Sequence, residues 1–223
     1  MFNIDNSTPV ASNGSFLTKN TIHRVKLMGV ELVESPGKDP KPVVKINFEG
    51  VEGGTIHDMI FPPTSTVRKV SGPKEYLSPS EAEQFSVKLR QYITALNPAL
   101  DKAITAGTKK LAANDWDGMR KIVKAAIENG GKSIGMETDL KVLQNSAGYA
   151  TIPGYIAGLS QKGEIYHRTK FIGDGISFTD YELTTIAKQA NAVPTPMANT
   201  SNDLDGAGAD ELGEDDLNFL ADL

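Results

Sequence analysis

The stretch Thr21-Ile-His-Arg-Val-Lys-Leu-Met-Gly-Val-Glu-Leu-Val33 decides how the fold begins. Its residues alternate between two sets, which are Val25, Leu27 and Val33 on one side and Arg24, Lys26 and Met28 on the other. A period of two residues is typical of a β-strand that buries one face. The stretch therefore predicts a long strand with an aliphatic inner face and a basic outer face.

Two further strands are predicted directly after it. Pro and Gly residues within 34–42 mark a turn, and the alternation resumes over 43–49. A glycine-rich hairpin connection then leads to a third strand over 55–61, which a pair of prolines ends. Phe48 and Phe61 are expected in the core, because each is an apolar residue of a predicted strand.

A block of helices is predicted next, over about 78–130. Its members are expected at residues 78–96, 98–105 and 115–129. Ser78 can cap the first helix and Glu81 can close a capping box with it, since the two lie three residues apart. Trp116 is expected to pack against the core from the third helix, because its apolar neighbours recur at helical spacing.

The chain then returns to β-structure and ends on one more helix. Strands are predicted over 133–143, 149–159 and 165–172, separated by Gly, Asn and Ser turns. A final helix is predicted over 179–192, with Thr179 as its N-cap. The side chains expected to bury one face of this helix are Tyr181, Leu183, Ile186 and Ala187.

The charges of the chain are segregated along its length. Residues 191–223 contain no Lys or Arg and hold eight of the 28 acidic residues, so residues 1–190 carry 23 basic and 20 acidic residues, a net charge of +3. The sequence therefore predicts a flexible N-terminal arm over 1–20, one folded domain over 21–192 and a disordered acidic tail over 193–223. A basic body joined to an acidic tail suggests that the tail folds over a surface meant for a polyanion.

Composition excludes several classes of protein. The chain has no cysteine and only three widely separated histidines, which leaves no disulfide, thiolate zinc site or thiol nucleophile. No apolar run is long enough to span a membrane, and residues 1–20 do not resemble a secretion signal. We therefore expect an intracellular protein without a membrane partner, a cofactor or a bound metal.

The predicted order of strands and helices is that of the oligonucleotide-binding (OB) fold, a small barrel of five or six strands with a helical insertion between its third and fourth strands. The chain also ends in the acidic and apolar run Glu214-Asp-Asp-Leu-Asn-Phe-Leu-Ala-Asp-Leu223. In both respects the chain resembles the bacteriophage-type single-stranded DNA-binding proteins, which join an OB barrel to an acidic C-terminus. The resemblance implies non-catalytic protection of single-stranded DNA during replication, recombination and repair.

The resemblance also implies a role for the tail, which would compete with DNA and recruit replication or recombination proteins. The tail residues that match this role by type are Asp215, Asp216, Leu217, Phe219, Leu220 and Leu223. The last residue is leucine where the family has phenylalanine, and the spread of apolar residues suits a short helix docked in a groove of a partner. A phage origin would place the protein in the host cytoplasm, and the sequence leaves open whether it forms a homo-oligomer.

Binding a single strand needs cations for the phosphates and exposed aromatic faces on which bases stack. The run 164–170 offers both, because alternation places Tyr166, Arg168 and Lys170 on one face and Ile165, Thr169 and Phe171 on the other. Further candidates share these side-chain types but lie elsewhere, and they are Arg24, Lys26, Lys45, Arg68, Lys69, Lys74, Tyr149 and Tyr155. The plainer alternative is an ordinary solvated face.

Two other functions remain open from the sequence. A magnesium-dependent nuclease would need clustered carboxylates, and Glu137 and Asp139 lie two residues apart on a predicted strand, where Glu164 or Asp58 could join them. An adaptor or structural protein, or an inhibitor that mimics DNA through its acidic tail, would need no catalytic residues. A mimic requires rigidly spaced carboxylates, whereas the Gly and Ala residues at 206–209 favour a flexible tail.

Overall fold

The computed structural model describes residues 16–71 and 76–191. Residues 1–15 of the predicted arm, Lys74, and residues 192–223 with the predicted acidic tail lie outside the described residues. None of the helices within the described ranges combines the length and apolar character that crossing a bilayer requires.

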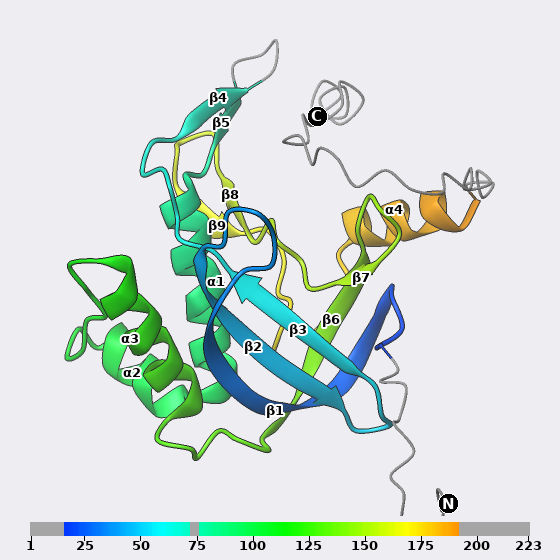
Figure 1. The fold of residues 1–223 in the computed structure, drawn as a ribbon. Coiled ribbons are helices and arrows are strands. Elements are labelled where there is room, and N and C mark those ends of the chain that lie inside the picture. Colours follow the sequence, from blue (N-terminus) through cyan, green and yellow to red (C-terminus); the bar gives the residue numbers. More distant parts are fainter. Residues whose placement is uncertain (1–15, 72–75, 192–223) are drawn as a thin grey trace, which may run out of the picture.

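One antiparallel sheet organises the molecule. Its strands are β1 (Thr21–Glu34), β2 (Pro42–Gly50), β3 (Thr55–Ile60), β6 (Glu137–Gln144) and β7 (Ala150–Thr151), in the spatial order β3-β2-β1-β6-β7. The sheet curls into a half barrel (Figure 1). The helices of the described chain are α1 (Glu81–Leu96), α2 (Pro98–Thr105), α3 (Trp116–Glu128) and α4 (Asp180–Asn191). The predicted mixed β/α architecture is confirmed at this level.

The first three predicted strands are confirmed, with one side chain placed differently. Phe48 is buried on β2 at 1% exposure, as predicted. Phe61 is 48% exposed, so its predicted place in the core is wrong. The reason is that β3 ends at Ile60, and Phe61 begins the extended segment that leads into two prolines.

A β-bulge interrupts the long first strand. The pairing of β1 with β2 shifts between Leu27 and Gly29, which leaves Met28 as an extra residue. An extra residue moves every later side chain to the opposite face. Val25 and Leu27 are buried before the bulge and Val30 after it, so the predicted single face that continued to Val33 is broken.

The segment between β3 and β6 contains a hairpin as well as the predicted helices. Strands β4 (Lys69–Ser71) and β5 (Tyr76–Ser78) pair with each other ahead of α1. This hairpin lies between the third predicted strand and the first predicted helix, where the sequence analysis placed no strand. Helices α2 and α3 end within one residue of their predicted limits.

The cap of α1 lies two residues later than predicted. Ser80, not Ser78, is the N-cap: its hydroxyl accepts the Glu83 backbone N–H at 3.2 Å, and the Glu83 carboxylate accepts the Ser80 N–H at 2.8 Å. Ser78 cannot take this role because its backbone pairs with Lys69 in the β4–β5 hairpin. Glu81 instead accepts hydrogen bonds from the N–H and hydroxyl of Thr64.

The core lies between the curled sheet and the helical block. Tyr92 of α1 stacks on Phe48 with ring centroids 6.2 Å apart and meets the edge of Phe171 at 4.9 Å. Trp116 packs against the core from α3 as predicted, and its indole N–H donates to the carbonyl of Pro42 at 2.6 Å. The helical insertion thus supplies core side chains to the half barrel.

The late strands are shorter than predicted. The predicted strand over 149–159 is split into β7 and β8 (Ala157–Leu159), and the one over 165–172 is reduced to β9 (Ile165–His167). β8 and β9 form a separate two-stranded hairpin. Ile165 and Tyr166 are consecutive in β9 and therefore point to opposite faces, and Ile165 is 41% exposed whereas Thr169 and Phe171 are buried.

Helix α4 starts where predicted but buries a different face. Thr179 caps it, with the Glu182 N–H donating to the Thr179 hydroxyl at 3.2 Å. Tyr181 and Leu183 are 47% and 50% exposed, and Glu182 is the buried residue of the helix, so the predicted apolar face is wrong. The reason is an ion pair, because Glu182 meets the fully buried Lys141 of β6 at 2.6 Å.

Candidate nucleic-acid interface

The β8–β9 hairpin carries the strongest candidate contact. Gly158 on β8 pairs directly with Tyr166 on β9. A Cβ atom at position 158 would lie 2.4 Å from Cζ of Tyr166, which means that the ring covers the bare glycine backbone. Tyr166 is nevertheless 50% exposed. One side of the aromatic ring is therefore supported by the hairpin while half of the side chain remains accessible.

Helix α1 holds this hairpin through the side-chain amide of Gln84. The amide oxygen of Gln84 accepts the backbone N–H groups of Ile156 and Ala157 at 3.1 and 2.8 Å, and its NH₂ donates to the Ala157 carbonyl at 2.9 Å. One glutamine thereby satisfies three backbone groups next to β8. Because each buried backbone group needs a partner, this arrangement fixes the hairpin on the helix.

A second glutamine of α1 secures the chain after β9. Gln91 donates to the Thr169 carbonyl at 2.8 Å and accepts the Phe171 N–H at 3.0 Å. Thr169 and Phe171 are buried, and Lys170 between them is exposed. The anchoring of its two neighbours therefore turns Lys170 outward.

Arg168 links β9 to helix α4. Its guanidinium lies over the ring of Tyr181, with Cζ 5.2 Å from the ring centroid, a cation–π arrangement. Arg168 is exposed, and its backbone N–H donates to Ile156 at 2.8 Å. Arg168 therefore brings a positive charge and a second exposed aromatic ring next to the β8–β9 hairpin.

Exposed tyrosines are concentrated in the last third of the described chain. Tyr149, Tyr155, Tyr166 and Tyr181 are between 47% and 67% exposed, and together we call them the tyrosine surface. Tyr149 follows the β6–β7 turn, where the Lys19 ammonium donates to the Gly148 carbonyl at 2.8 Å. Tyr149 lies just before β7, Tyr155 just before β8, Tyr166 in β9 and Tyr181 in α4, and these elements can be followed in Figure 1.

Arg68 contacts carboxylate and backbone groups rather than open solvent. Its Nε and Nη2 atoms donate to Glu83 at 2.7–3.1 Å, and Nη1 donates to the Gly163 carbonyl in the β8–β9 turn at 2.9 Å. The hydrogen bonds from Arg68, followed by the one from the Ser80 N–H, lower the pKa of Glu83 to about 2. Arg68 therefore joins the segment before β4 to α1 and to the hairpin that bears Tyr166.

The predicted basic face of β1 is largely neutralised by acidic neighbours. Arg24 donates to Asp139 at 3.1 Å and to Asp174 at 2.5 Å, and these hydrogen bonds raise the pKa of Arg24. Lys26 lies 3.7 Å from Glu137. These two cations therefore bring less free positive charge to the surface than the sequence suggested.

The remaining predicted cations fall into three situations. Lys45 of β2 lies 3.6 Å from Glu31, Lys69 of β4 is exposed, and Lys74 lies outside the described residues. Arg68 also contacts the β8–β9 turn but is paired with Glu83, whereas Arg168 and Lys170 lie next to the tyrosine surface without an ion pair within the described residues.

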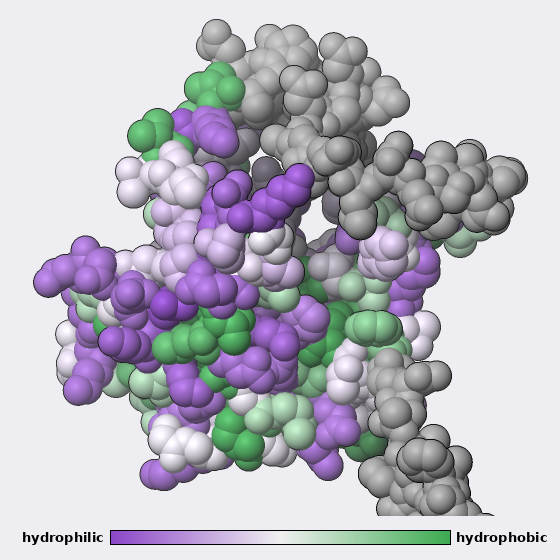
Figure 2. Space-filling view, viewed as in Figure 1, coloured by the Kyte–Doolittle hydropathy of each residue, from purple (hydrophilic) through white to green (hydrophobic). Residues whose placement is uncertain are grey.

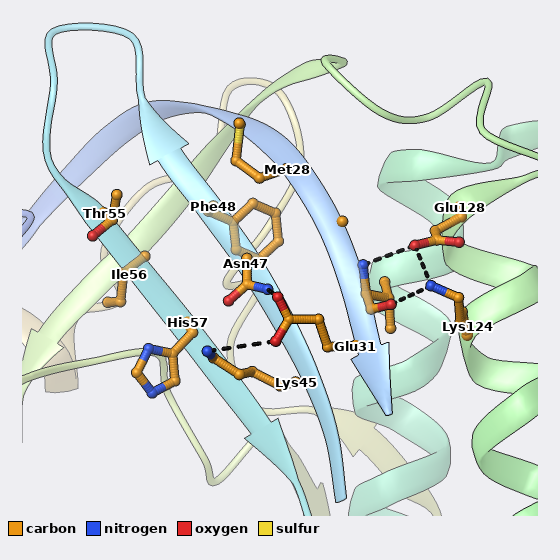
Figure 3. Close-up of a pocket in the computed structure, with 12 residues that line it drawn as sticks. Met28, Glu31, Lys45, Asn47, Phe48, Thr55, Ile56, His57, Lys124 and Glu128 are labelled. Carbon is orange, nitrogen blue, oxygen red and sulfur yellow. Dashed lines mark hydrogen bonds and ion pairs between the residues drawn. The ribbon is translucent and has the colours of Figure 1, made fainter. Parts of the chain in front are cut away.

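A cleft of about 560 Å³ lies beside the bulge in β1 (Figure 3). Lys45 and Asn47 of β2 both meet Glu31 there, while Lys124 of α3 pairs with Glu128 at 2.8 Å. Apolar residues on this side of the molecule form small patches among polar ones (Figure 2). Because each lysine of the cleft faces a carboxylate, the cleft offers a phosphate less attraction than Arg168 and Lys170 do.

The carboxylates considered for a metal-dependent nuclease are not brought together. Glu137 and Asp139 share β6, where both meet Arg24. Asp58 lies on β3, with β2 and β1 between it and β6, and it is bonded to Lys88 and to the Tyr92 hydroxyl. Within residues 16–71 and 76–191, no group of three or more His, Asp or Glu side chains could hold a metal ion.

A buried polar network fixes helix α4 to the sheet. Lys141 donates to Thr169 at 2.7 Å and to Glu182 at 2.6 Å, and the Thr169 hydroxyl donates to Glu182 at 2.8 Å. Burial alone would raise the pKa of Glu182, but the hydrogen bonds from Lys141, Thr179 and Thr169 outweigh it and lower that pKa. The network holds the start of α4, and with it Tyr181, beside β9.

Sequence reasoning missed Tyr181 and Gly158. Tyr181 was assigned to a buried helix face because its spacing is amphipathic, and no local signal shows that Glu182 is buried in its place. Gly158 does leave a signal, because a glycine inside a strand often marks a close approach of another group. The approach of Tyr166 could have been inferred from that rule once the pairing of the two strands was known.

The tail residues predicted to bind partners, from Asp215 to Leu223, lie outside the described residues. Within the described residues, the tyrosine surface and its neighbouring cations are therefore the candidate binding groups. Comparison of the chain with protein-family models, with curated proteins and with solved structures gave no match.

Proposed function

We propose that this protein binds single-stranded DNA along the tyrosine surface and has no catalytic role. The observation that carries the proposal is Tyr166, whose ring is supported by Gly158 on β8 and is half exposed. Exposed aromatic rings bind unpaired bases by stacking, at about 1–3 kcal/mol per base, and tolerate any sequence because every base has a π-face. A supported and accessible ring is suited to this role.

Cations next to the rings supply the second requirement. Arg168 lies over Tyr181, and Lys170 projects outward between two buried residues. Phosphates of a strand whose bases stack on Tyr166 and its neighbours would meet these two charges. In that complex Arg168 keeps an aromatic ring on one side and gains a phosphate on the other.

The proposal includes an OB-type barrel. The order β3-β2-β1-β6 and the helical insertion between β3 and β6 are the features that support it. In this assignment β6 is the fourth barrel strand, and the segments from β7 to β9 take the place of the fifth. The tyrosine surface then lies on the last part of the barrel and on α4.

The acidic segment from Asp203 on is proposed to compete with the strand and to recruit replication or recombination proteins. Its support is the distribution of charge, since residues 191–223 contain eight acidic and no basic residues. Asp203→Asn combined with Asp205→Asn in the full chain should raise affinity for single-stranded DNA at low salt. Unchanged affinity at low salt would contradict the competing role.

The direct test is fluorescence anisotropy with labelled oligo(dT) across a salt series. Tyr166→Ala should weaken binding by about 5- to 150-fold, which corresponds to one lost stack of 1–3 kcal/mol. The matched control is Phe16→Ala, which removes a 77% exposed aromatic residue next to the start of β3 and should leave affinity unchanged. Circular dichroism should show that both variants keep the fold.

Two results would overturn the proposal. Absence of oligo(dT) binding by the native chain would remove DNA binding itself and favour the adaptor function. Equal affinities of the native chain and the Tyr166→Ala variant would remove the tyrosine surface as the binding site. Loss of the labelled strand only when magnesium is added would instead indicate a nuclease.

A further inference from the structure

An apolar groove of about 480 Å³ lies on the helical insertion. It is formed by α1, α2, α3 and the segment 107–111 that follows α2. Its apolar lining is made by Phe85, Leu89, Ile93, Ile104, Leu111 and Met119. The proposed DNA-binding function gives this groove no role, because the tyrosine surface is built from residues 149–181.

The rim of the groove is basic. Lys109 and Lys110 line it and are exposed, and within the described residues neither ammonium takes part in an ion pair. Arg90 also lines the groove, but its guanidinium is engaged by Asp101 at 2.6 Å and by the Thr105 hydroxyl. An apolar groove with two free lysines fits a ligand that combines apolar side chains with carboxylates.

The chain itself contains a segment of this chemistry. Residues 214–223, Glu-Asp-Asp-Leu-Asn-Phe-Leu-Ala-Asp-Leu, hold four large apolar side chains and four carboxylates and no cation. Leu217 and Leu220 lie three residues apart, and Phe219 and Leu223 four apart, which are the spacings that one side of a helix presents to a groove. Three of the carboxylates precede the first leucine, so they could meet the lysine rim while the apolar residues enter.

The connecting chain is long enough to reach. Residues 192–213 separate α4 from this segment. Their 22 peptide units span up to ~70 Å when extended. A domain of about 170 residues has a radius of gyration of only ~15 Å, so any point of its surface lies within reach.

We infer that the groove between α1, α2 and α3 holds residues 214–223 of the same chain. Phe219, Leu220 and Leu223, which lie on one side of a helix, enter the apolar groove, and the acidic residues at the start of the segment meet Lys109 and Lys110. The helical insertion then holds residues 214–223 apart from the tyrosine surface, and the acidic residues from Asp203 to Glu211 are the ones left to compete with a DNA strand. This inference does not depend on DNA binding and is tested without DNA.

Disulfide trapping tests the inference in the full chain, because the native sequence contains no cysteine. Ser86 lines the groove and is exposed, so the pair Ser86→Cys and Asn218→Cys places one thiol in the groove and one in the segment. The control pair combines Asn218→Cys with Ser146→Cys, an exposed serine in the β6–β7 turn. Mild oxidation followed by electrophoresis without reductant and by peptide mass spectrometry measures the rate of cross-linking.

The groove pair should cross-link within one chain about tenfold faster than the control pair, because docking raises the effective concentration of the two thiols. Lys109→Glu combined with Lys110→Glu should reduce that rate, and so should Phe219→Ala in the segment. Leu204→Ala, which changes the same acidic region outside residues 214–223, should not. The Phe219→Ala arm keeps the test decisive if the double lysine variant fails to fold.

Either of two results would overturn the inference. Equal rates for the groove and control pairs would show that residues 214–223 do not dock in this groove. Cross-links formed only between two chains, seen as a band of dimer mass, would assign the groove to the segment of a second copy. DNA affinity is not measured in this experiment, so its failure would leave the proposed function standing.

Discussion

The ring of Tyr166 covers the backbone of Gly158 on the neighbouring strand, and a Cβ atom at position 158 would lie 2.4 Å from its Cζ. Contact at that distance is impossible, so any side chain at position 158 must displace the ring. The obstructing atoms belong to the outer end of the tyrosine, which can rotate away at little cost to the backbone. The glycine therefore sets the position of the aromatic ring.

Gly158→Ala should weaken oligo(dT) binding about as much as Tyr166→Ala, with unfolding free energy changed by less than about 1 kcal/mol. The double variant should bind no more weakly than Tyr166→Ala alone, because the ring is already absent. Gly154→Ala is the matched control, since a Cβ there meets no atom within 4 Å. Additive losses in the double variant, measured by anisotropy, would contradict a shared mechanism.

Lys170→Ala should weaken binding to every oligonucleotide sequence by a similar factor. A contact to phosphate carries no sequence information, and each lost contact should lower the slope of log affinity against log salt by about 0.7 for a single strand. Lys132→Ala removes an exposed lysine after α3 and should leave the slope unchanged. A loss confined to one sequence would instead indicate a contact to a base.

Lys141→Met should destabilise the protein by about 3–5 kcal/mol, because it leaves the carboxylate of Glu182 buried without its partner. Adding Glu182→Gln should recover part of that loss by removing the buried charge. Lys26→Met breaks a pair in which both side chains are more than 40% exposed and should cost no more than about 1 kcal/mol. Urea denaturation of the three variants measures these differences, and equal costs at both lysines would contradict the argument.

Acid should weaken the contact between Arg68 and Glu83. The pKa of Glu83 is lowered from 4.5 to about 2 in the folded protein, so its contribution to stability is complete above pH 4.5 and is lost as the pH falls toward 2. The side chain of Glu83 is 24% exposed, and with the resulting solvent screening we expect this contribution to be about 1–2 kcal/mol.

Glu83→Gln can preserve the capping box while removing the charge, so the variant should lose this part of the pH dependence of unfolding. Glu52→Gln, a matched change in the exposed β2–β3 turn, should retain the native profile. Thermal unfolding between pH 2 and 7 compares the variants. Identical profiles for native protein and Glu83→Gln would exclude the contribution of this carboxylate.

The sequence predicted those parts of the fold that depend on local patterns. Alternation located β1, β2 and β3, and the Asn97-Pro98 signal separated α1 from α2. The bulge at Met28 was missed, although it leaves a signal in the sequence: the buried residues Val25 and Leu27 before it and Val30 after it lie in opposite phases of the alternation. The burial of Glu182 leaves no such signal, since it depends on Lys141, which lies 41 residues away in the sequence.

The sequence located candidate residues of the site but not their partners. Tyr166, Arg168 and Lys170 are exposed, but so are Ile165 and His167, so the predicted alternation between exposed and buried residues holds only over 168–171. Arg24 and Arg68 were chosen by residue type, but they pair with Asp174 and Glu83, which only the fold brings near them. Sequence patterns therefore identified the candidate cations without showing which of them are already neutralised.

The anchoring of the β8–β9 hairpin by Gln84 and Arg68 bears on the entropy of binding. The side-chain amide of Gln84 hydrogen-bonds the backbone N–H and carbonyl of Ala157 in β8, and Arg68 donates to the carbonyl of Gly163 in the turn. A platform fixed in this way before a ligand arrives loses little conformational freedom when a base settles on Tyr166. The entropic cost of forming the complex then falls mainly on the incoming strand, so a strand already stiffened by stacking of its own bases would have less to lose.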